Sequence, residues 1–203
     1  MNRPRLLIAT RSEHKLRELR ELLALDRAEL VSLDELGVDG DPVEDGDTFE
    51  DNAAIKARFG AEATGLPTLA DDSGLEVDAL DGGPGVRTRR YAGEAATDAD
   101  NNAKLLAALG DLPPERRGAR YVCALVLAVP GQPMVYARGE CRGRIATRAR
   151  GSGGFGYDPI FEPESEPPGG RTFGEWSAED KHRISHRGRA ARAIAPRLAE
   201  RGF

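Results

Sequence analysis

Two adjacent aspartates, Asp71 and Asp72, lie between a short apolar segment and an alternating one, and Ser73 and Gly74 follow them. Neighbouring carboxylates repel each other, so a fold that keeps both ionised in a partly buried place must supply positive charge there, most commonly a divalent metal bound through oxygen. Asp, Ser and Gly are also ordinary turn residues, and the stretch taken alone favours a polar turn between two strands. The rest of the chain decides between these two interpretations.

The bulk composition fits a globular protein. The 203 residues, 39% of them hydrophobic, suffice for one compact domain or two tightly joined lobes with a buried core. The formal net charge of -5 argues against a protein that coats nucleic acid, because such binding depends on many Lys and Arg contacts to phosphate. The sequence shows no apolar run near the roughly twenty residues that span a bilayer, and the apolar part of residues 1–9 is too short for a signal peptide. We therefore expect a cytoplasmic protein that binds neither nucleic acid nor membranes.

The two cysteines, Cys123 and Cys141, flank a turn-forming segment at residues 130–133. A hairpin over this segment would bring them opposite each other, but in a reducing compartment they should remain thiols. We interpret them as small core residues rather than as a redox pair.

Hydrophobic spacing predicts strands and helices that alternate along the chain. Strands are expected at residues 6–9, 30–33, 67–70, 75–79, 121–129 and 135–145. Helices are expected at residues 13–25, 48–65, 97–110, 177–184 and from 184 onward, with Thr48, Thr97 and Ser177 as N-caps. The pattern predicts an α/β protein in which Asp71 and Asp72 lie at the end of a strand.

Residues 10–15 follow the first predicted strand and open the first helix. Unpaired backbone N–H groups and the helix dipole favour an anion at such a place, and Ser12 is a candidate cap beside Lys15. The segment lacks the glycines of a Walker A loop, so taken alone it is more simply a capped helix.

An acidic loop at residues 39–47 leads directly into the helix capped by Thr48, whose predicted capping box includes Asp51. Asn52 and Lys56 lie one turn apart on that helix and could line a site together with the acidic loop. A charge run of this kind is most often a solvated loop, and the two side chains taken alone could equally well be surface residues.

The glycine-rich segment 151–161 carries Phe155 and Tyr157 and ends on Asp158 and Pro159. Glycines allow close approach of the backbone to a ligand, and an aromatic ring held there could stack on a base. Flexible linkers rarely interleave Phe and Tyr, so the pattern slightly favours a binding loop.

Two clusters of basic residues are further candidates for binding a nucleotide. Lys181, His186 and Arg187 gather near two helix starts, where such donors suit a nucleotide, although a lone His beside an Arg is more often a surface residue. The arginines of residues 87–90 could neutralise phosphates or pair with the acidic loops, and their spacing does not choose between these roles.

Five motifs in this order resemble the RdgB-type, or inosine-triphosphatase-like, pyrophosphatases of non-standard purine nucleotides. The family patterns T-x-N-x-x-K, T-F-x-x-N-A-x-x-K-A, A-D-D-S-G-L, G-G-F-G-Y-D-P-I-F and K-x-x-I-S-H-R-G-x-A are similar to residues 10–15, 48–57, 70–75, 153–161 and 181–190. Each is a modest signal alone, but together they cover nearly the whole chain. One departure is Ser12, where the family has Asn, and serine is shorter and lacks the amide's second functional group.

The resemblance implies an α/β fold with a long central mixed sheet, flanking helices and two lobes around a nucleotide cleft. It implies that residues 1–203 form a single nucleotide pyrophosphatase domain that is usually a homodimer. The implied reaction is Mg²⁺-dependent hydrolysis of ITP, dITP and XTP between the α and β phosphates, giving the monophosphate and pyrophosphate and so cleansing the nucleotide pool.

The resemblance also implies roles for individual residues. Asp72 would be the catalytic residue and would bind Mg²⁺ together with Glu44, while Asp72 or Asp71 helps to deprotonate the attacking water. Successive residues of a strand point opposite ways, so one aspartate should face the metal, and we expect it to be Asp72. The implied substrate-binding residues are Thr10, Arg11, Ser12, Glu13, His14, Lys15, Lys56, Ser73, Phe155, Gly156, Tyr157, Asp158, Lys181, His186 and Arg187.

Within this set, Thr10, Lys15 and Lys56 would hold phosphate oxygens, and Phe155 would stack on the purine. Donors such as Lys181, His186 or Arg187 would favour the carbonyl at position 6 of hypoxanthine and xanthine over the amine of adenine. GTP shares that carbonyl, and the sequence does not show how it would be excluded.

Two alternative functions stay open at this point, one a different enzyme and the other a binding protein without enzymatic activity. A Maf-like nucleotide pyrophosphatase would catalyse the same reaction on other bases, but the motifs at residues 153–159 and 185–188 argue against it. A nucleotide-sensing module would bind without hydrolysis; the intact acidic motifs disfavour it, whereas Ser12 leaves it open. Nucleic-acid binding is the least favoured role, given the net charge.

Overall fold

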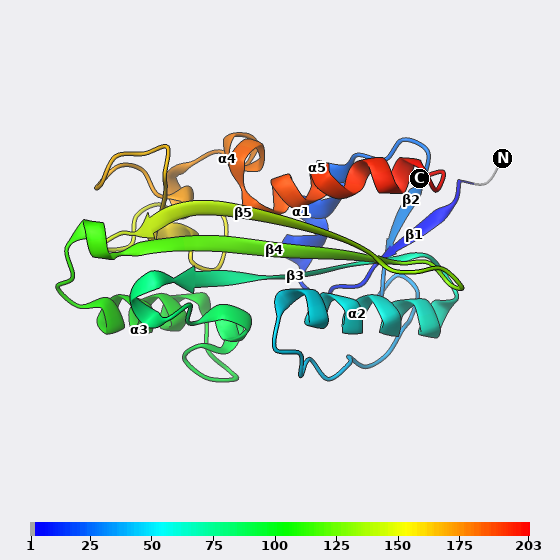
Figure 1. Ribbon diagram of the computed structural model, residues 1–203, viewed down its shortest axis with the longest axis horizontal. Helices are drawn as coiled ribbons and strands as arrows, with labels where there is room; N and C mark the ends of the chain where they lie inside the picture. Colours follow the sequence, from blue (N-terminus) through cyan, green and yellow to red (C-terminus); the bar gives the residue numbers. More distant parts are fainter. Residues whose placement is uncertain (1–2) are drawn as a thin grey trace. The chain divides into compact units, whose positions relative to one another are not determined.

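The computed structural model describes residues 3–203, in which six strands form one sheet with the order β2-β1-β3-β4-β5-β6 (Figure 1). The strands are β1 (Arg5–Ile8), β2 (Glu29–Ser32), β3 (Thr68–Val77), β4 (Gly118–Ala128), β5 (Val135–Ile145) and β6 (Phe161–Pro163). The α-helices are α1 (Glu13–Leu23), α2 (Phe49–Thr64), α3 (Asp98–Leu109), α4 (Ala178–Ile184) and α5 (His186–Ala199). Because β1 pairs in parallel with β2 and β3 while β5 and β6 are antiparallel, the sheet is mixed, and the predicted α/β fold is confirmed.

The chain divides into two compact units. Unit 1 comprises Met1–Asp72, Cys123–Gly139 and Arg187–Phe203, and unit 2 comprises Ser73–Val122 and Glu140–His186. Strands β3, β4 and β5 contribute residues to both units, so neither is continuous in sequence. The prediction of one domain with two lobes around a cleft is not decided by this division and stays a prediction. Within residues 3–203, no helix combines the length and apolar character needed to cross a membrane.

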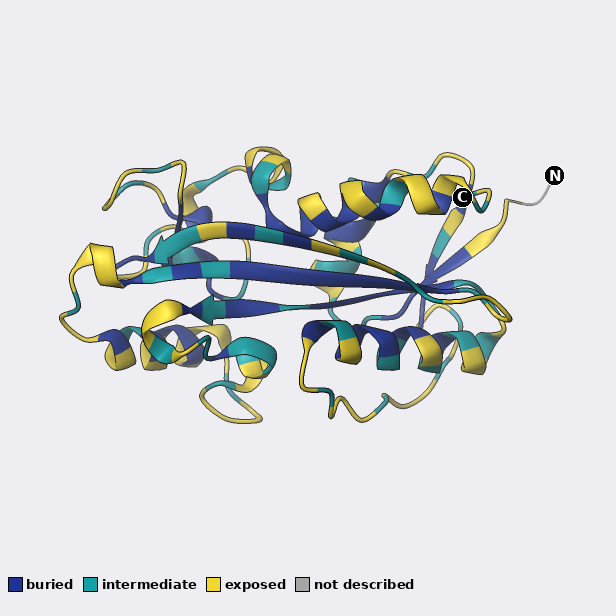
Figure 2. Ribbon diagram, viewed as in Figure 1, coloured by how far each residue is buried: buried dark blue, intermediate teal, exposed yellow. Residues whose placement is uncertain are grey.

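In unit 1 helices cover both faces of the sheet, with α1 and α5 on one side and α2 on the other (Figure 1). Leu6 and Ile8 of β1 share a core cluster with residues of α1 and α5. The intervening Leu7 points the opposite way, and a Cβ at Gly60 of α2 would lie only 2.9 Å from its side chain. Figure 2 shows β1 as buried except at its start, and the outer sides of α2 and α5 as exposed. The alternation of side chains along each strand therefore decides which helix a residue meets.

Strand β3 is a single strand from Thr68 to Val77, and Asp71 and Asp72 lie inside it. The prediction of two shorter strands, with the aspartates at a strand end, is wrong in this respect. Both aspartates are buried. Both carboxylates can be buried in a strand because each has a cationic partner on its own face of the sheet, Lys15 for Asp71 and Lys56 for Asp72.

The helix ends follow the predicted capping residues. Thr48, Thr97 and Ser177 each accept a hydrogen bond from the backbone N–H three residues later. Helix α2 stops before Gly65, whose φ of 70° is a left-handed conformation that glycine adopts without strain. Pro196 lies inside α5 without ending it.

Residues 162–170 are rich in Pro, Glu and Gly, but the first two of them form the end of β6. Glu162 is buried there and accepts a hydrogen bond from Arg150 at 2.7 Å. A second cation, Arg144, lies 3.7 Å from the same carboxylate. The local composition does not predict a buried strand here. Burial of Glu162 is possible because Arg150 and Arg144, which lie elsewhere in the chain, neutralise its charge.

The core of unit 2 is rich in aromatic rings. The ring centroids of Tyr121 and Phe161 are 4.7 Å apart, and those of Phe161 and Phe173 are 5.2 Å apart. Cys141 belongs to this core and Cys123 to that of unit 1. Both cysteines are buried and neither forms a disulfide within residues 3–203, which confirms their interpretation as core residues.

Replacing Gly60 by alanine tests the close packing of α2 on the sheet. Alanine usually stabilises a helix interior relative to glycine by about 0.5–1 kcal/mol. Here the new Cβ would lie 2.8 Å from Thr68, so we expect Gly60→Ala to lower the free energy of unfolding by about 1–3 kcal/mol. Urea denaturation measures the change, with the exposed Glu62→Ala as a control expected within about 0.5 kcal/mol of the wild type. A Gly60→Ala protein more stable than the wild type would contradict the packing.

Candidate active site

Asp71 lies at the centre of a buried ion-pair network in unit 1. Arg187 donates from Nε to Asp71 Oδ2 at 2.9 Å, and Lys15 Nζ lies 2.5 Å from Oδ1. Arg187 Nη1 lies 2.5 Å from Glu18 Oε2. The side chains of Asp71 and Arg187 are both 0% exposed. Two negative and two positive groups from β3, α1 and α5 therefore balance one another inside the protein.

These contacts fix the protonation state of Asp71. Burial alone would raise the pKa of this carboxyl, but Arg187 and Lys15 outweigh it and hold the pKa well below its usual range. Burial, reinforced by the Asp71 charge, raises the pKa of the Cys123 thiol well above its usual value. The protonated thiol donates to Asp71 Oδ2 at 3.0 Å. Asp71 is therefore a firmly bonded anion that is poorly suited to accept a proton.

Asp72 points to the opposite face of β3, toward α2, because side chains alternate along a strand. Lys56 Nζ lies 2.6 Å from Asp72 Oδ1 and 3.1 Å from Glu44 Oε2, so one ammonium bridges two carboxylates. The side chain of Glu44 is 39% exposed, whereas those of Lys56 and Asp72 are 12% and 10% exposed. This cluster is thus nearer to solvent than the Asp71 network.

The pKa of Asp72 is shifted in the opposite direction from that of Asp71. Burial raises the pKa of Asp72, and the charges of Lys56 and Lys15 only partly offset the effect. For Lys56, burial would lower the pKa, but Asp72 and Glu44 raise it above its usual value. Adjacent carboxyls whose environments separate their pKa values are typical of sites in which one group is fixed and the other exchanges a proton. The two adjacent carboxyls thus differ, because Asp71 is held firmly as an anion whereas burial makes the Asp72 carboxyl easier to protonate.

Asn52 holds the acidic loop that carries Glu44 against the N-terminus of α2. Its Oδ1 accepts from the Gly46 N–H at 2.9 Å, and its Nδ2 donates to the Gly46 carbonyl at 3.2 Å. A Cβ at Gly46 would lie 2.7 Å from Asp51, so only glycine fits this close approach. The structure therefore joins Asn52 and Lys56 to the acidic loop, as their spacing on the helix suggested.

Glu44 and Asp72 fit the ligand preference of Mg²⁺. Their oxygens approach a common cation, the Lys56 ammonium. Mg²⁺ usually takes one or two carboxylates together with waters and substrate phosphates, rather than a cage made only of protein. Across residues 3–203 there is no group of three or more His, Cys, Asp or Glu side chains that could hold a metal. The donor set therefore suits a metal ion that binds together with phosphate.

Residues 10–15 form the predicted turn into α1. Ser12 is the N-cap and accepts from the Lys15 N–H at 3.4 Å, while Thr10 Oγ1 accepts from the Ser12 N–H at 3.2 Å. Serine thus performs the capping role at the position where the resemblance implies Asn. Lys15 extends from this turn to Asp71.

The other three residues of this segment, Arg11, Glu13 and His14, lie in a loop contact or on the surface. Arg11 donates to the carbonyls of Val38 and Gly40, each at 2.7 Å, and so fastens the loop that follows β2. Glu13 and His14 are exposed on the first turn of α1. The structure gives Arg11 a role in holding this loop, and the substrate contacts of all three residues stay predictions.

In unit 2, Asp158 connects the glycine-rich loop to α4. Its Oδ2 accepts from Lys181 Nζ at 2.7 Å and from the Phe155 N–H at 2.9 Å, and its Oδ1 accepts from the Tyr121 hydroxyl at 3.3 Å. Lys181 Nζ also lies 4.9 Å from the centroid of the Phe155 ring. Asp158 and Lys181 are buried, whereas Phe155 is half-buried. Three predicted substrate-binding residues thus form one cluster.

The remaining predicted residues of unit 2 surround this cluster or lie in β3. The His186 ring stacks on Tyr121 with centroids 4.6 Å apart and planes inclined by 10°. Tyr157 is buried, which raises the pKa of its hydroxyl, and this hydroxyl donates to a backbone carbonyl at 2.8 Å. Gly156 has a left-handed φ of 62°, and Ser73 follows Asp72 in β3.

Arg187 belongs to unit 1, where its guanidinium contacts Asp71 and Glu18. The sequence suggested it as a donor to the base, and that role stays a prediction. Its observed contacts give it another role, which is to hold β3 against α1 and α5.

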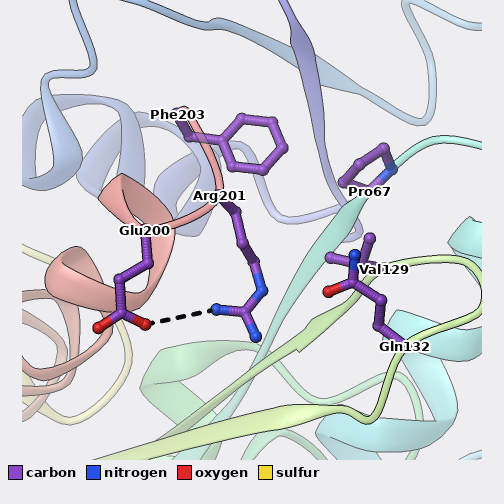
Figure 3. A pocket seen from close by; sticks show the side chains of 6 residues that line it. All are labelled: Pro67, Val129, Gln132, Glu200, Arg201 and Phe203. Atoms are coloured by element: carbon purple, nitrogen blue, oxygen red, sulfur yellow. Dashed lines mark ion pairs between the residues drawn. The ribbon is translucent and has the colours of Figure 1, made fainter.

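A pocket of about 440 Å³ lies elsewhere in unit 1 (Figure 3). It is lined by Pro67, Val129, Gln132, Glu200, Arg201 and Phe203. Its charged residues are Arg201 and Glu200, which lie 3.8 Å apart. None of the predicted site residues lines it, so this pocket is separate from the candidate site.

The family model for the Ham1 family matches residues 6–197. The chain belongs to the Ham1 family. It is 48% identical over 202 residues to the dITP/XTP pyrophosphatase of Nocardia farcinica, covering 98% of this chain and 97% of that protein. It is 50% identical over 185 residues to the dITP/XTP pyrophosphatase of Syntrophobacter fumaroxidans, covering 91% and 78%. These findings confirm the family resemblance drawn from the five motifs.

Solved Ham1 structures have the same fold. A HAM1 protein from Coxiella burnetii superposes with a TM-score of 0.87 at 40% identity, covering 97% of this chain and 99% of that one. A protein from Mycobacterium abscessus described as a nucleoside-triphosphatase, or dITP/XTP pyrophosphatase, has a TM-score of 0.76 at 47% identity, covering 95% and 99%. The mixed α/β fold with flanking helices that the resemblance implies is therefore confirmed as that of Ham1 proteins.

Two residues of the network around Asp71, Glu18 and Cys123, were not predicted from the sequence. Glu18 lies among apolar residues on the inner side of α1, and a charged residue within an apolar stripe is a signal that a partner exists. The sequence could not identify that partner as Arg187, which is 169 residues away. Cys123 gave no polar signal, because buried cysteine normally behaves as a small apolar residue.

Removing the charge of Asp71 should destabilise this Ham1 protein. Asp71→Asn leaves the buried Arg187 and its neighbour Lys15 with too little negative charge, so we expect the free energy of unfolding to fall by about 3–5 kcal/mol. Chemical denaturation measures the loss. The exposed Asp26→Asn is a matched control, expected within about 0.5 kcal/mol of the wild type. Equal stability of the Asp71→Asn protein and this control would show that the network does not hold the fold.

Proposed function

We propose that this chain hydrolyses the triphosphates of non-standard purines, ITP, dITP and XTP, to the monophosphate and pyrophosphate in a Mg²⁺-dependent reaction. Ham1 relatives that match nearly its whole length are named dITP/XTP pyrophosphatases, and the chain is accordingly a nucleoside triphosphate pyrophosphatase, a hydrolase. The observation that carries the proposal beyond the family name is the Glu44, Lys56 and Asp72 cluster. It combines two carboxylates for a metal with a cation for phosphate.

The charges of unit 1 suit a triphosphate. Such a substrate brings about four negative charges, which metal ions and cationic side chains must neutralise beside the carboxylates. Glu44 and Asp72 would hold Mg²⁺, which when bound supplies charge neutralisation and a more acidic water. Lys15 and Lys56 each have three N–H donors, so each can contact a phosphate oxygen as well as its present carboxylate partner.

The two aspartates have separate roles in this proposal. Asp72, whose pKa is raised by burial, takes a proton from the attacking water. Asp71, whose pKa is held low by Arg187 and Lys15, keeps Lys15 in place. The hydroxyl of Thr10, at the turn into α1, would add a neutral donor to the phosphates.

The cluster in unit 2 suits a purine. Phe155 is half-buried and offers a ring on which a base can stack, and Lys181 is held beside that ring by Asp158. A lysine donor favours a carbonyl at position 6 and meets another donor when the base is adenine. His186, stacked on Tyr121, and Arg187 are the other candidate donors.

We further propose that the enzyme acts as a cytoplasmic homodimer on the free nucleotide pool, with residues 1–203 as one domain. The support for this is the resemblance of the whole chain to the family. The net charge of -5 supports a free nucleotide rather than a nucleic acid as the substrate.

A substrate panel tests the reaction and its selectivity together. With Mg²⁺ present, the purified protein should release pyrophosphate from ITP, dITP and XTP at least about a hundredfold faster than from ATP, because a donor faces a donor when adenine is bound. Ion chromatography separates pyrophosphate from orthophosphate. Release of orthophosphate would contradict cleavage between the α and β phosphates, faster turnover of other bases would favour a Maf-like enzyme, and binding without turnover would indicate a sensor.

Replacing Asp72 by asparagine separates chemistry from folding. Asp72→Asn should lower kcat for dITP by about a hundredfold or more, since it removes a metal ligand and the proton acceptor. Its melting temperature should stay near that of the wild type, because Lys56 retains Glu44 as a partner. An active Asp72→Asn enzyme would remove Asp72 from its proposed role.

A further inference from the structure

Helix α3 of unit 2 forms hydrogen bonds to both the backbone N–H and the backbone carbonyl of one residue of the glycine-rich loop, Gly156. Asp98 Oδ2 accepts from the Gly156 N–H at 2.6 Å, and Asn102 Nδ2 donates to the Gly156 carbonyl at 3.1 Å. Asp98 and Asn102 are one helical turn apart and so lie on the same side of α3. The helix therefore clamps the loop at the residue that directly follows Phe155.

The loop depends on such a clamp because its glycines leave the backbone with many accessible conformations. Gly154 and Gly156, on either side of Phe155, have φ values of +71° and +62°. Glycine adopts this left-handed conformation readily, but it adopts others as readily. Asp158 fixes the Phe155 N–H from within the loop at 2.9 Å. Asp158 also connects the loop to α4 through Lys181, and α3 adds a connection at Gly156.

Helix α3 is itself well anchored. Thr97 and Asp100 form a complete capping box at its N-terminus. Asn101 accepts from the Ala92 N–H at 2.8 Å and donates to the Arg89 carbonyl at 3.0 Å, which ties the preceding segment to the helix. The apolar side of α3 lies in the core of unit 2. It can therefore act as a rigid base for the loop.

The side chain of Asn102 indicates that the clamp does more than stabilise the fold. Asn102 is only 7% exposed, and among residues 3–203 its Oδ1 has no hydrogen-bond partner. A buried acceptor without a partner lowers stability. A leucine, of similar size, would avoid that loss, but it would also remove the bond to Gly156.

We propose that Asp98 and Asn102 are positioning residues that fix Phe155 through Gly156 and thereby set the affinity for the purine base. The inference rests on the proposed function, in which Phe155 stacks on the base. Asp98 and Asn102 lie in unit 2, whereas the proposed groups for hydrolysis, Asp72 and Lys56, lie in unit 1. Loss of the clamp should therefore change KM much more than kcat.

Steady-state kinetics with dITP test the clamp. Asp98→Ala and Asn102→Leu should each raise KM by about tenfold, the range expected for one lost hydrogen bond, with kcat within about twofold of the wild type. Asn102→Leu should at the same time melt at the same or a higher temperature than the wild type. A purely structural role cannot produce this combination of weaker binding and unimpaired stability. Unchanged KM in Asn102→Leu would overturn the proposal.

Two controls locate the effect. Asp100→Ala removes the carboxylate half of the capping box but no contact with the loop, so it should lower the melting temperature and leave KM unchanged. In a Phe155→Leu background, Asp98→Ala should raise KM no further, because the clamp acts through the Phe155 ring. A full additional increase of KM in that background, or an equal increase from Asp100→Ala, would contradict a positioning role.

A second readout keeps this inference separate from the proposed reaction. If the wild type fails to hydrolyse dITP, the proposed function fails, but hydrogen exchange still reports on the clamp. The Gly156 amide should exchange about tenfold faster in Asp98→Ala than in the wild type, since its acceptor is gone, and at the wild-type rate in Asp100→Ala. An unchanged exchange rate in Asp98→Ala would overturn the clamp whether or not the protein is active.

Discussion

The buried ion pair between Asp71 of β3 and Arg187 of α5 determines how the rest of the unit 1 site is arranged. Both side chains are fully buried, so each depends on the other to offset the loss of hydration. Lys15 and Glu18 of α1 complete the balance of charge. The network therefore ties the first helix and the last helix to one position of one strand, which also fixes the turn at the start of α1.

Because side chains alternate along β3, fixing Asp71 on one face directs Asp72 to the other. There Asp72 meets Lys56 of α2, and Asn52 of the same helix holds the loop that brings Glu44 to that lysine. One strand thus separates a carboxylate that serves the fold from a carboxylate that is available for chemistry. Like charges in adjacent residues are tolerated because each faces its own cation.

The features that could be predicted from sequence were mostly local. The caps Thr48 and Thr97 were predicted correctly because capping depends on residues a few positions apart. The continuity of β3 was missed because Asp, Ser and Gly locally favour a turn, and the partner that overrides this preference at Asp71, Arg187, is 116 residues away. The loop clamp at Gly156 was missed for the same reason, since Asp98 is 58 residues from it. Motif order identified the family but not the contacts between motifs.

The most direct test of this division between the two aspartates is the binding of Mn²⁺, as a paramagnetic substitute for Mg²⁺, in the presence of a non-hydrolysable dITP analogue. Electron paramagnetic resonance gives the dissociation constant for the wild type and for Asp72→Asn. We predict that Asp72→Asn weakens Mn²⁺ binding at least about tenfold, because a carboxylate ligand is lost. Unchanged Mn²⁺ affinity in a folded Asp72→Asn protein would contradict the assignment of Asp72 as the carboxylate that faces the metal.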